Sequence, residues 1–195
     1  MRRLYDRLPD RVTVGKRIYR LDLDFRNVLR MMDILARDDI LPGPKEYLAL
    51  KCVMKRKPPK DCRAALATIS AMLFGTDIPE NGGERVTSFE QDADMIRAAF
   101  LQCFGINLYR DKLHWFEFQA LVQNIPGGCK YMDVLNVRTQ EIPAANKYNQ
   151  KEREAIMKAK ARYALKISPE ERKRNYENSV HSVFRSMEGL AKSKG

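Results

Sequence analysis

The chain has 195 residues, of which 44% are hydrophobic and 31% are charged, and its net charge at neutral pH is +11. This length and apolar fraction suit one globular domain with an appendage. No apolar run approaches the roughly 20 residues that cross a bilayer, and the N-terminus lacks the apolar stretch of a secretory signal. We therefore expect a soluble cytoplasmic protein.

The distribution of charge predicts two parts. Residues 147–195 contain thirteen Lys and Arg against six Asp and Glu, a net charge of +7, whereas residues 1–146 carry +4. The segment Pro143-Ala144-Ala145-Asn146 before this change has the composition of a linker. The sequence therefore predicts an α-helical body over residues 1–146 and a basic helical extension over residues 147–195.

A small β-hairpin and an amphipathic helix are predicted near the N-terminus. Arg11–Val14 and Arg17–Arg20 flank a glycine-lysine dipeptide, which suits a two-residue turn. Asp24, or alternatively Asp22, can cap the helix that follows. Apolar residues recur in this helix at helical spacing: Phe25, Val28, Leu29, Met32, Leu35 and Ala36.

Proline-containing breaks separate the next two predicted helices. The segment 41–44, Leu-Pro-Gly-Pro, ends the first helix, and a helix around Tyr47 to Met54 follows. The basic segment KRKPPK at 55–60 is a second break. A further helix, which Gly75 ends, is lined by Ala65, Ile69, Met72 and Leu73.

A capping box predicts the start of the next helix. Ser88 and Gln91 form this box, and Glu90 and Asp92 lie in the positive first turn. Gly105 is placed to end the helix. Its apolar face comprises Ala93, Ile96, Phe100, Cys103 and Phe104.

The helix after that is apolar on two sides and is therefore expected to be central. Asp111 can cap it, and the Pro-Gly-Gly segment at 126–128 ends it. One face comprises Leu113, Phe116, Ala120 and Leu121, and the other comprises Trp115, Phe118 and Val122. Core packing is the favoured role of Phe116.

The last part of the chain predicts three more helices. Tyr131, Val134 and Leu135 indicate a short one. Residues 150–165 favour a charged helix with a weak apolar stripe of Met157, Ala161, Ala164 and Leu165. Ser168 and Pro169 mark a sharp helix start. The stripe that follows is spaced like a coiled-coil seam over two heptads and comprises Tyr176, Val180, Val183, Met187 and Leu190.

No residue pattern points to an enzyme, a metal site or a bound cofactor. His114 has neither a nucleophile motif nor a second histidine at metal spacing, so a structural ring is expected. The N-terminus of a helix already explains Glu90, Asp92 and Asp94. The cysteines show no CxxC spacing and are expected to be reduced thiols: Cys52, Cys62, Cys103 and Cys129.

Nucleic-acid binding is the other activity that the charge could support. Clustered Lys and Arg at 55–60 and in the extension could neutralise phosphates, and Tyr148, Tyr163 and Tyr176 could stack on bases. Glutamates in the same extension dilute its positive field. We therefore expect at most weak, non-specific binding that falls steeply with salt.

A family resemblance rests on several separated runs: FEQDAD, IRAAFLQ and GINL between Phe89 and Leu108, LHWFEFQAL at Leu113–Leu121, and VRTQEIP at Val137–Pro143. Shorter runs at 4–9, 24–26 and 163–165 follow the same order. On these runs the chain resembles a family encoded next to the tape-measure gene in the tail-gene cluster of siphophages, the long-tailed phages of Gram-positive bacteria and their prophages.

The resemblance implies a tail-assembly role in the host cytoplasm, as a non-enzymatic chaperone of the tail tape-measure protein. It leaves open contact with the tail-tube protein and self-association. Two alternatives remain, namely a structural tail component retained in the virion and a basic nucleic-acid-binding module. The residues predicted to bind the partner lie on the central and terminal helices: Trp115, Phe118, Val122, Tyr176, Val180, Val183, Met187 and Leu190.

Overall fold

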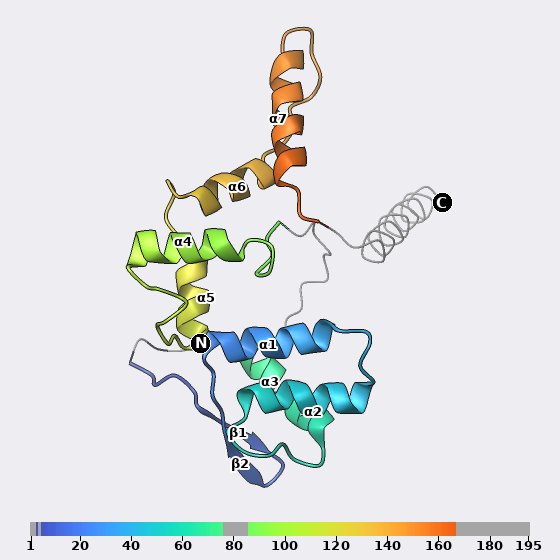
Figure 1. Cartoon of the computed structure of the whole chain (residues 1–195), viewed down its shortest axis with the longest axis vertical. Helices are drawn as coiled ribbons and strands as arrows, with labels where there is room; N and C mark the ends of the chain where they lie inside the picture. The colour runs from blue at the N-terminus through green and yellow to red at the C-terminus, as the bar shows by residue number, and fades with distance from the viewer. Residues whose placement is uncertain (1–2, 4, 76–85, 167–195) are drawn as a thin grey trace, which may run out of the picture. The chain divides into compact units, whose positions relative to one another are not determined.

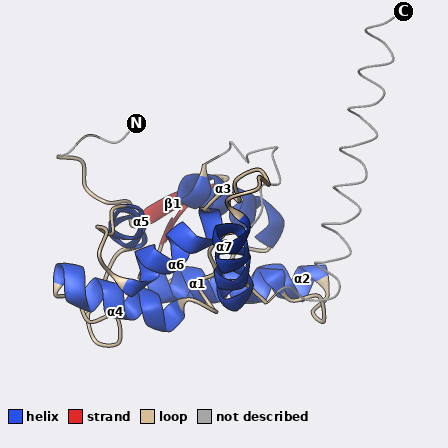
Figure 2. Ribbon diagram, turned by 90° about the horizontal axis from the view of Figure 1, so that it is seen from above, coloured by secondary structure: helices blue, strands red, loops and turns tan. Residues whose placement is uncertain are grey.

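The computed structural model of this chain describes residues 3, 5–75 and 86–166. The fold of these residues is mainly helical, with a two-stranded antiparallel hairpin before the helices (Figure 1, Figure 2), as predicted. No helix among them is both long enough and apolar enough to cross a membrane. The elements are β1 Arg11–Val14, β2 Arg17–Arg20, α1 Phe25–Ala36, α2 Pro42–Val53, α3 Cys62–Phe74, α4 Ala93–Phe104, α5 Trp115–Gln123, α6 Lys130–Thr139 and α7 Gln150–Tyr163.

The chain forms two compact units. Unit 1 comprises Met1–Glu84 and Asp94–Asp133, and unit 2 comprises Arg85–Ala93 and Val134–Gly195, each as far as it is described. Each unit is therefore assembled from segments that are distant in sequence. The domain boundary predicted at residue 146 is a different division, and it stays a prediction.

The hairpin has its predicted limits. β1 and β2 pair antiparallel, with Arg11 opposite Arg20 and Val14 opposite Arg17. Gly15 has a φ of +58° at the turn. Because glycine has no Cβ, it adopts this conformation without the steric cost that other residues incur. The two-residue turn thus fixes the register of the strands.

Asp24 caps α1, as predicted. Its carboxylate accepts a hydrogen bond from the backbone N–H of Arg26 at 3.0 Å. Phe25 and Val28 are buried as their spacing predicts, but Met31, which lies outside the predicted stripe, is fully buried as well. α1 packs against both α2 and α5, so its buried face is wider than one stripe.

α2 begins earlier than predicted. It starts at Pro42, directly after Leu41, and not near Tyr47, because a proline needs no N–H partner in the first turn of a helix. Asp61 caps α3, and Gly75 ends it with a φ of +81°. α2 packs against α1 and α3, and α3 also packs against β1 (Figure 1). The fully buried residues of α2 and α3 are Ala49, Leu50, Val53, Ala65 and Ile69.

Stacked aromatic rings form another part of the unit 1 core. The ring of Phe118 lies 4.6 Å from that of Phe25, 5.4 Å from that of Phe100 and 5.8 Å from that of Trp115, measured between centroids. Aromatic pairs at such spacings add about 0.5–1.5 kcal/mol beyond the burial of their surface. These contacts join α1 and α4 to α5.

The predicted start of α4 at Ser88 is wrong. Residues 89–92 form a turn, and the helix begins at Ala93. The hydroxyl of Ser88 does accept from the N–H of Gln91 at 3.3 Å, but the N–H of Ser88 donates to the carboxylate of Asp92 at 2.9 Å and not to Gln91. The guanidinium of Arg138 also donates to this carboxylate and holds it in place.

The predicted cap of α5 is also wrong. The carboxylate of Asp111 accepts from the backbone N–H of Asn107 at 2.7 Å and closes the preceding turn. His114 is the cap, because its Nδ1 accepts from the N–H of Phe116 and its own N–H donates to the carboxylate of Glu117 at 3.0 Å. This leaves Leu113 outside the helix, in an extended segment.

The apolar stripe predicted for α7 is wrong. Met157 is 43% exposed, Ala161 and Ala164 are exposed too, and only Leu165 of the predicted stripe is half-buried, whereas Ile156 is buried. The less exposed residues follow the helical spacing of another face: Ile156, Ala159, Lys160 and Tyr163. Because this face includes Lys160, it does not appear as an apolar stripe in the sequence. The helix start predicted at Ser168 and the stripe from 176 to 190 lie outside the described residues.

Candidate functional site

The described residues among those predicted to bind a partner occupy two different environments. Trp115 and Phe118 are each 2% exposed, so their side chains belong to the core of unit 1. Val122 and Phe116 are half-buried, and the ring of Phe116 stacks on that of His114 at 5.4 Å. The remaining five lie outside the described residues: Tyr176, Val180, Val183, Met187 and Leu190.

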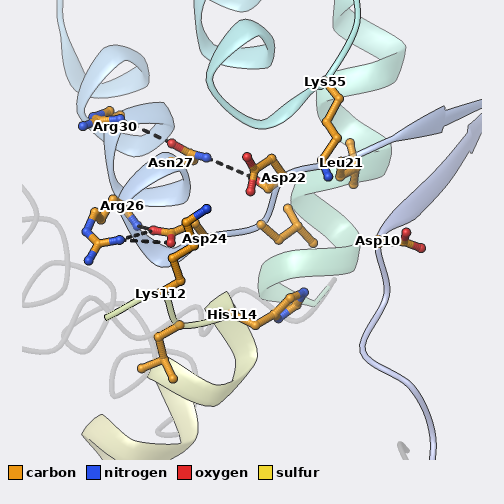
Figure 3. A pocket seen from close by; sticks show the side chains of 12 residues that line it. Asp10, Leu21, Asp22, Asp24, Arg26, Asn27, Arg30, Lys55, Lys112 and His114 are labelled. Carbon is orange, nitrogen blue, oxygen red and sulfur yellow. Dashed lines mark hydrogen bonds and ion pairs between the residues drawn. The ribbon is translucent and has the colours of Figure 1, made fainter. Parts of the chain in front are cut away.

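A pocket of about 470 Å³ opens in unit 1 beside the first turn of α1 (Figure 3). Its floor is the extended segment 20–25, which backbone hydrogen bonds hold on both sides. The N–H of Asp22 donates to the carbonyl of Val53 at 2.7 Å, and the carbonyl of Leu23 accepts from the N–H of Trp115 at 2.7 Å. These bonds tie the ends of α2 and α5 to the floor, so the pocket is formed by the fold itself.

Arg26 fixes one side of the pocket. Its guanidinium donates to the carboxylate of Asp24 at 3.1 Å, to the carbonyl of Leu108 at 2.9 Å and to the carbonyl of Asp111 at 2.7 Å. The turn at 108–111 is thereby held against the N-terminus of α1. Because these bonds use the guanidinium on both of its terminal nitrogens, Arg26 acts as a structural clamp.

His114 is committed to structural hydrogen bonds. Its Nδ1 accepts from the N–H of Phe116 at 3.3 Å, and its Nε2 lies 3.2 Å from the carbonyl oxygen of Pro9. With a backbone donor on one nitrogen and a carbonyl acceptor on the other, the ring carries its proton on Nε2 and donates it to Pro9. This is the structural role that the sequence predicted for His114.

Charged side chains surround the pocket, and no motif in the sequence groups them. Asp22, Arg30, Lys55 and Lys112 come from the floor, from α1 and from the loops beside α2 and α5 (Figure 3). They are separated by up to 90 residues, and each looks like an ordinary surface charge. Only the pairing of segment 20–25 with both loops brings them together, so no local signal could have found them.

A buried ion pair organises unit 2. The guanidinium of Arg138 donates to both carboxylate oxygens of Asp92 at 2.8 Å, to the carbonyl of Val86 at 3.0 Å and to the carbonyl of Tyr163 at 2.6 Å. The side chains of Arg138 and Asp92 are 10% and 1% exposed. Burial by itself raises the pKa of Asp92, but the hydrogen bonds from Arg138 and Ser88 outweigh it and hold the pKa below its ordinary value.

Further polar bonds join the end of α7 to this pair. The side-chain amide of Gln91 donates to the carbonyl of Lys166 and accepts from its N–H, both at 2.8 Å. The ammonium of Lys160 donates to the carbonyls of Arg138 and Gln140, both at 2.7 Å. The end of α7 and the residues after it are therefore hydrogen-bonded to Gln91, which precedes Asp92, and to the backbone at 138–140.

Several of these bonds cross the predicted domain boundary at residue 146, so two fragments can test that boundary. We expect a fragment of residues 1–146 to keep a cooperative thermal transition, because the core of unit 1 lies before residue 134. A fragment of residues 1–166 should be more stable, since it keeps Tyr163 and Lys166 as partners of Arg138 and Gln91. Thermal unfolding followed by circular dichroism compares the two. Loss of any cooperative transition in the shorter fragment would contradict the two-part organisation.

The thiols and carboxylates do not gather into a metal site in the part of the chain that the structure describes. The four cysteines are unpaired. Burial raises the pKa of the thiols of Cys52, Cys62 and Cys103, which disfavours their thiolate forms. At neutral pH these three thiols therefore favour their protonated forms.

Comparison with known proteins gives one match. The family model described as "Bacteriophage Gp15 protein" matches residues 4–165 and so covers most of the chain, with residues of both units. No curated protein and no solved structure matches the chain. The matched range includes every run on which the phage resemblance rests. The chain therefore belongs to the bacteriophage Gp15 protein family.

Proposed function

We propose that this protein is a phage tail assembly protein that acts as a non-enzymatic chaperone of the tail tape-measure protein in the host cytoplasm. Its membership in the bacteriophage Gp15 family is the observation that supports the phage role. The ordered runs between residues 4 and 165 support placement in the tail-gene cluster. The finer assignment to the tape-measure protein is our inference from that resemblance.

The proposed mechanism is the masking of apolar surface. A long tail protein made of amphipathic helices exposes apolar stripes until tube subunits cover them, and such stripes aggregate. A chaperone offers them apolar and aromatic side chains, and a helix laid in a groove binds through anchors at i, i+3, i+4 and i+7. The terminal stripe from Tyr176 to Leu190 has this spacing.

The described residues also offer apolar contacts on unit 1. Leu101 on α4 is 54% exposed, and Tyr109 in the turn beyond it is 71% exposed. The guanidinium of Arg97 lies 4.5 Å from the centroid of the Tyr109 ring, which holds that ring in place. Tyrosine and arginine are enriched among the residues that dominate binding energies. This surface is therefore a second candidate contact for the partner.

Co-expression with the tape-measure protein of the same gene cluster should keep that protein soluble and yield a complex that co-purifies. Alanine at Val180, Val183 and Met187 together should weaken the complex, because these residues form the terminal stripe. Alanine at Arg172 and Arg174, off that stripe, is the matched control and should have less effect. Affinity purification with quantification of the bound partner measures both.

The alternative role is a structural tail component. Failure of the wild-type protein to co-purify with the tape-measure protein, together with its stoichiometric presence in finished particles, would reject the chaperone and leave this alternative. Binding to a defined nucleic acid that survives physiological salt would instead favour a basic nucleic-acid-binding module.

A further inference from the structure

More cationic than anionic side chains of the pocket beside α1 are without an ion-pair partner among the described residues. The ammonium groups of Lys55 and Lys112 have no hydrogen-bond or ion-pair partner among the described residues, and the guanidinium of Arg30 donates there only to the amide oxygen of Asn27, at 3.3 Å. The guanidinium of Arg26 already donates to Asp24, Leu108 and Asp111, so we do not count it as available to a ligand. Three cationic side chains are therefore available to a ligand.

The carboxylates of the pocket do not balance these cations. Asp24 is bonded to Arg26, and Asp10 lies 3.4 Å from Arg11. Asp22 is the one lining carboxylate without a side-chain partner in the described part of the chain. Three available cations thus face one available carboxylate, which gives the pocket a net preference for negatively charged groups.

The cations reach the pocket from separate elements, on a floor that is already ordered. Arg30 lies on α1, Lys55 follows α2 and Lys112 precedes α5, and they lie around Asp22 (Figure 3). Because backbone bonds on both sides fix segment 20–25, a ligand would not have to order the floor on binding. The volume of about 470 Å³ is in the range of ligand pockets and accommodates a few side chains.

We propose that this pocket binds an acidic polypeptide segment of a partner protein, whose carboxylates contact Arg30, Lys55 and Lys112. A nucleic-acid strand fits less well for two reasons. No Phe, Tyr or Trp is among the residues that line the pocket, and the ring of His114 already stacks on that of Phe116, so bases have little on which to stack. The carboxylate of Asp22 would repel a continuous phosphate backbone, whereas a mixed polypeptide can place a basic or neutral residue opposite it.

The first test uses a fluorescently labelled oligoglutamate peptide and full-length protein, with binding followed by fluorescence anisotropy. The double variant Lys55→Glu/Lys112→Glu should bind the peptide at least about tenfold more weakly than the wild type. The double variant Lys16→Glu/Lys51→Glu, which makes the same charge change at two lysines that do not line the pocket, is the matched control and should bind like the wild type. Unchanged thermal midpoints show that the variants are folded.

Equal losses in the two double variants would overturn the proposal, because the attraction would then come from overall charge. Tighter binding of a labelled oligothymidylate than of oligoglutamate, lost in the Lys55→Glu/Lys112→Glu variant, would overturn it in favour of nucleic acid. Retention of peptide affinity in that variant would show that the pocket is not the binding site.

That the acidic segment belongs to the tape-measure protein rests on the proposed function, and a second test separates the two claims. If the wild type and the Lys55→Glu/Lys112→Glu variant co-purify equally with the tape-measure protein, the assignment of the acidic segment to that protein fails and the chaperone proposal stands. If neither co-purifies but the peptide still binds through the pocket, the chaperone proposal fails and the pocket proposal stands. Loss of co-purification in the pocket variant alone supports both.

Discussion

Replacing Phe100 with alanine should lower the free energy of unfolding by about 3–5 kcal/mol, the usual cost of removing a buried aromatic side chain. Phe100 is fully buried, and its ring stacks on that of Phe118 and meets that of Phe104 edge-on at 5.5 Å. Its removal leaves a cavity between α4 and α5 that rigid neighbouring rings cannot fill. Urea denaturation followed by circular dichroism measures the change.

Phe116→Ala is the matched control for this experiment. The sequence predicted a core position for Phe116, and hence a similar loss, but the ring is half-buried. We therefore expect its replacement to cost clearly less than that of Phe100, since less apolar surface is removed from contact. A loss below about 1 kcal/mol for Phe100→Ala would contradict the packing of α4 on α5.

Features set by neighbouring residues could be predicted from the sequence. The hairpin depends on two short strands and a glycine that accepts a positive φ, so its limits were found. The cap of α1 at Asp24 and the end of α3 at Gly75 depend on groups within a few residues of the helix terminus. For these elements local chemistry and the final fold agree.

Features set by distant residues could not be predicted. Asp111 is a sound local cap for α5, but the N–H of Trp115 donates to the carbonyl of Leu23, and the helix begins at Trp115 with His114 as its cap. Asp92 looked like a first-turn carboxylate until Arg138, 46 residues away, was found to bind it. Sequence periodicity carries no information about such pairings.

The face of α7 shows a different limit. A search for apolar residues selected Met157 and its neighbours, but the less exposed face includes Lys160, whose ammonium is satisfied by two carbonyls. A lysine can bury its aliphatic stem while its charged end is hydrogen-bonded. A binary pattern of apolar and polar residues therefore selected the wrong face of the helix, about one residue away from the buried one, and Ile156 was missed.

The second large effect is expected from Asp92→Asn, which should lower the free energy of unfolding by about 3–5 kcal/mol. The substitution leaves the guanidinium of Arg138, 10% exposed, without its counter-charge, and an unpaired buried charge is costly. Asp94→Asn is the matched control two residues away. Asp94 also pairs with an arginine at 2.8 Å, but its side chain is 92% exposed, so little change is expected. Urea denaturation of the full-length variants provides the comparison.

The pH dependence of stability tests the cause of this effect. The pKa of Asp92 is lowered in the folded protein, so the unfolded chain binds its proton more readily. The stabilisation is complete above the pKa of an unfolded aspartate, about 3.9, and is lost as the pH falls through the lower folded value. The wild type should therefore lose its advantage over Asp92→Asn only below about pH 4. A difference in stability between the two proteins that stays constant down to the most acidic pH at which both fold would contradict the ion pair as its source.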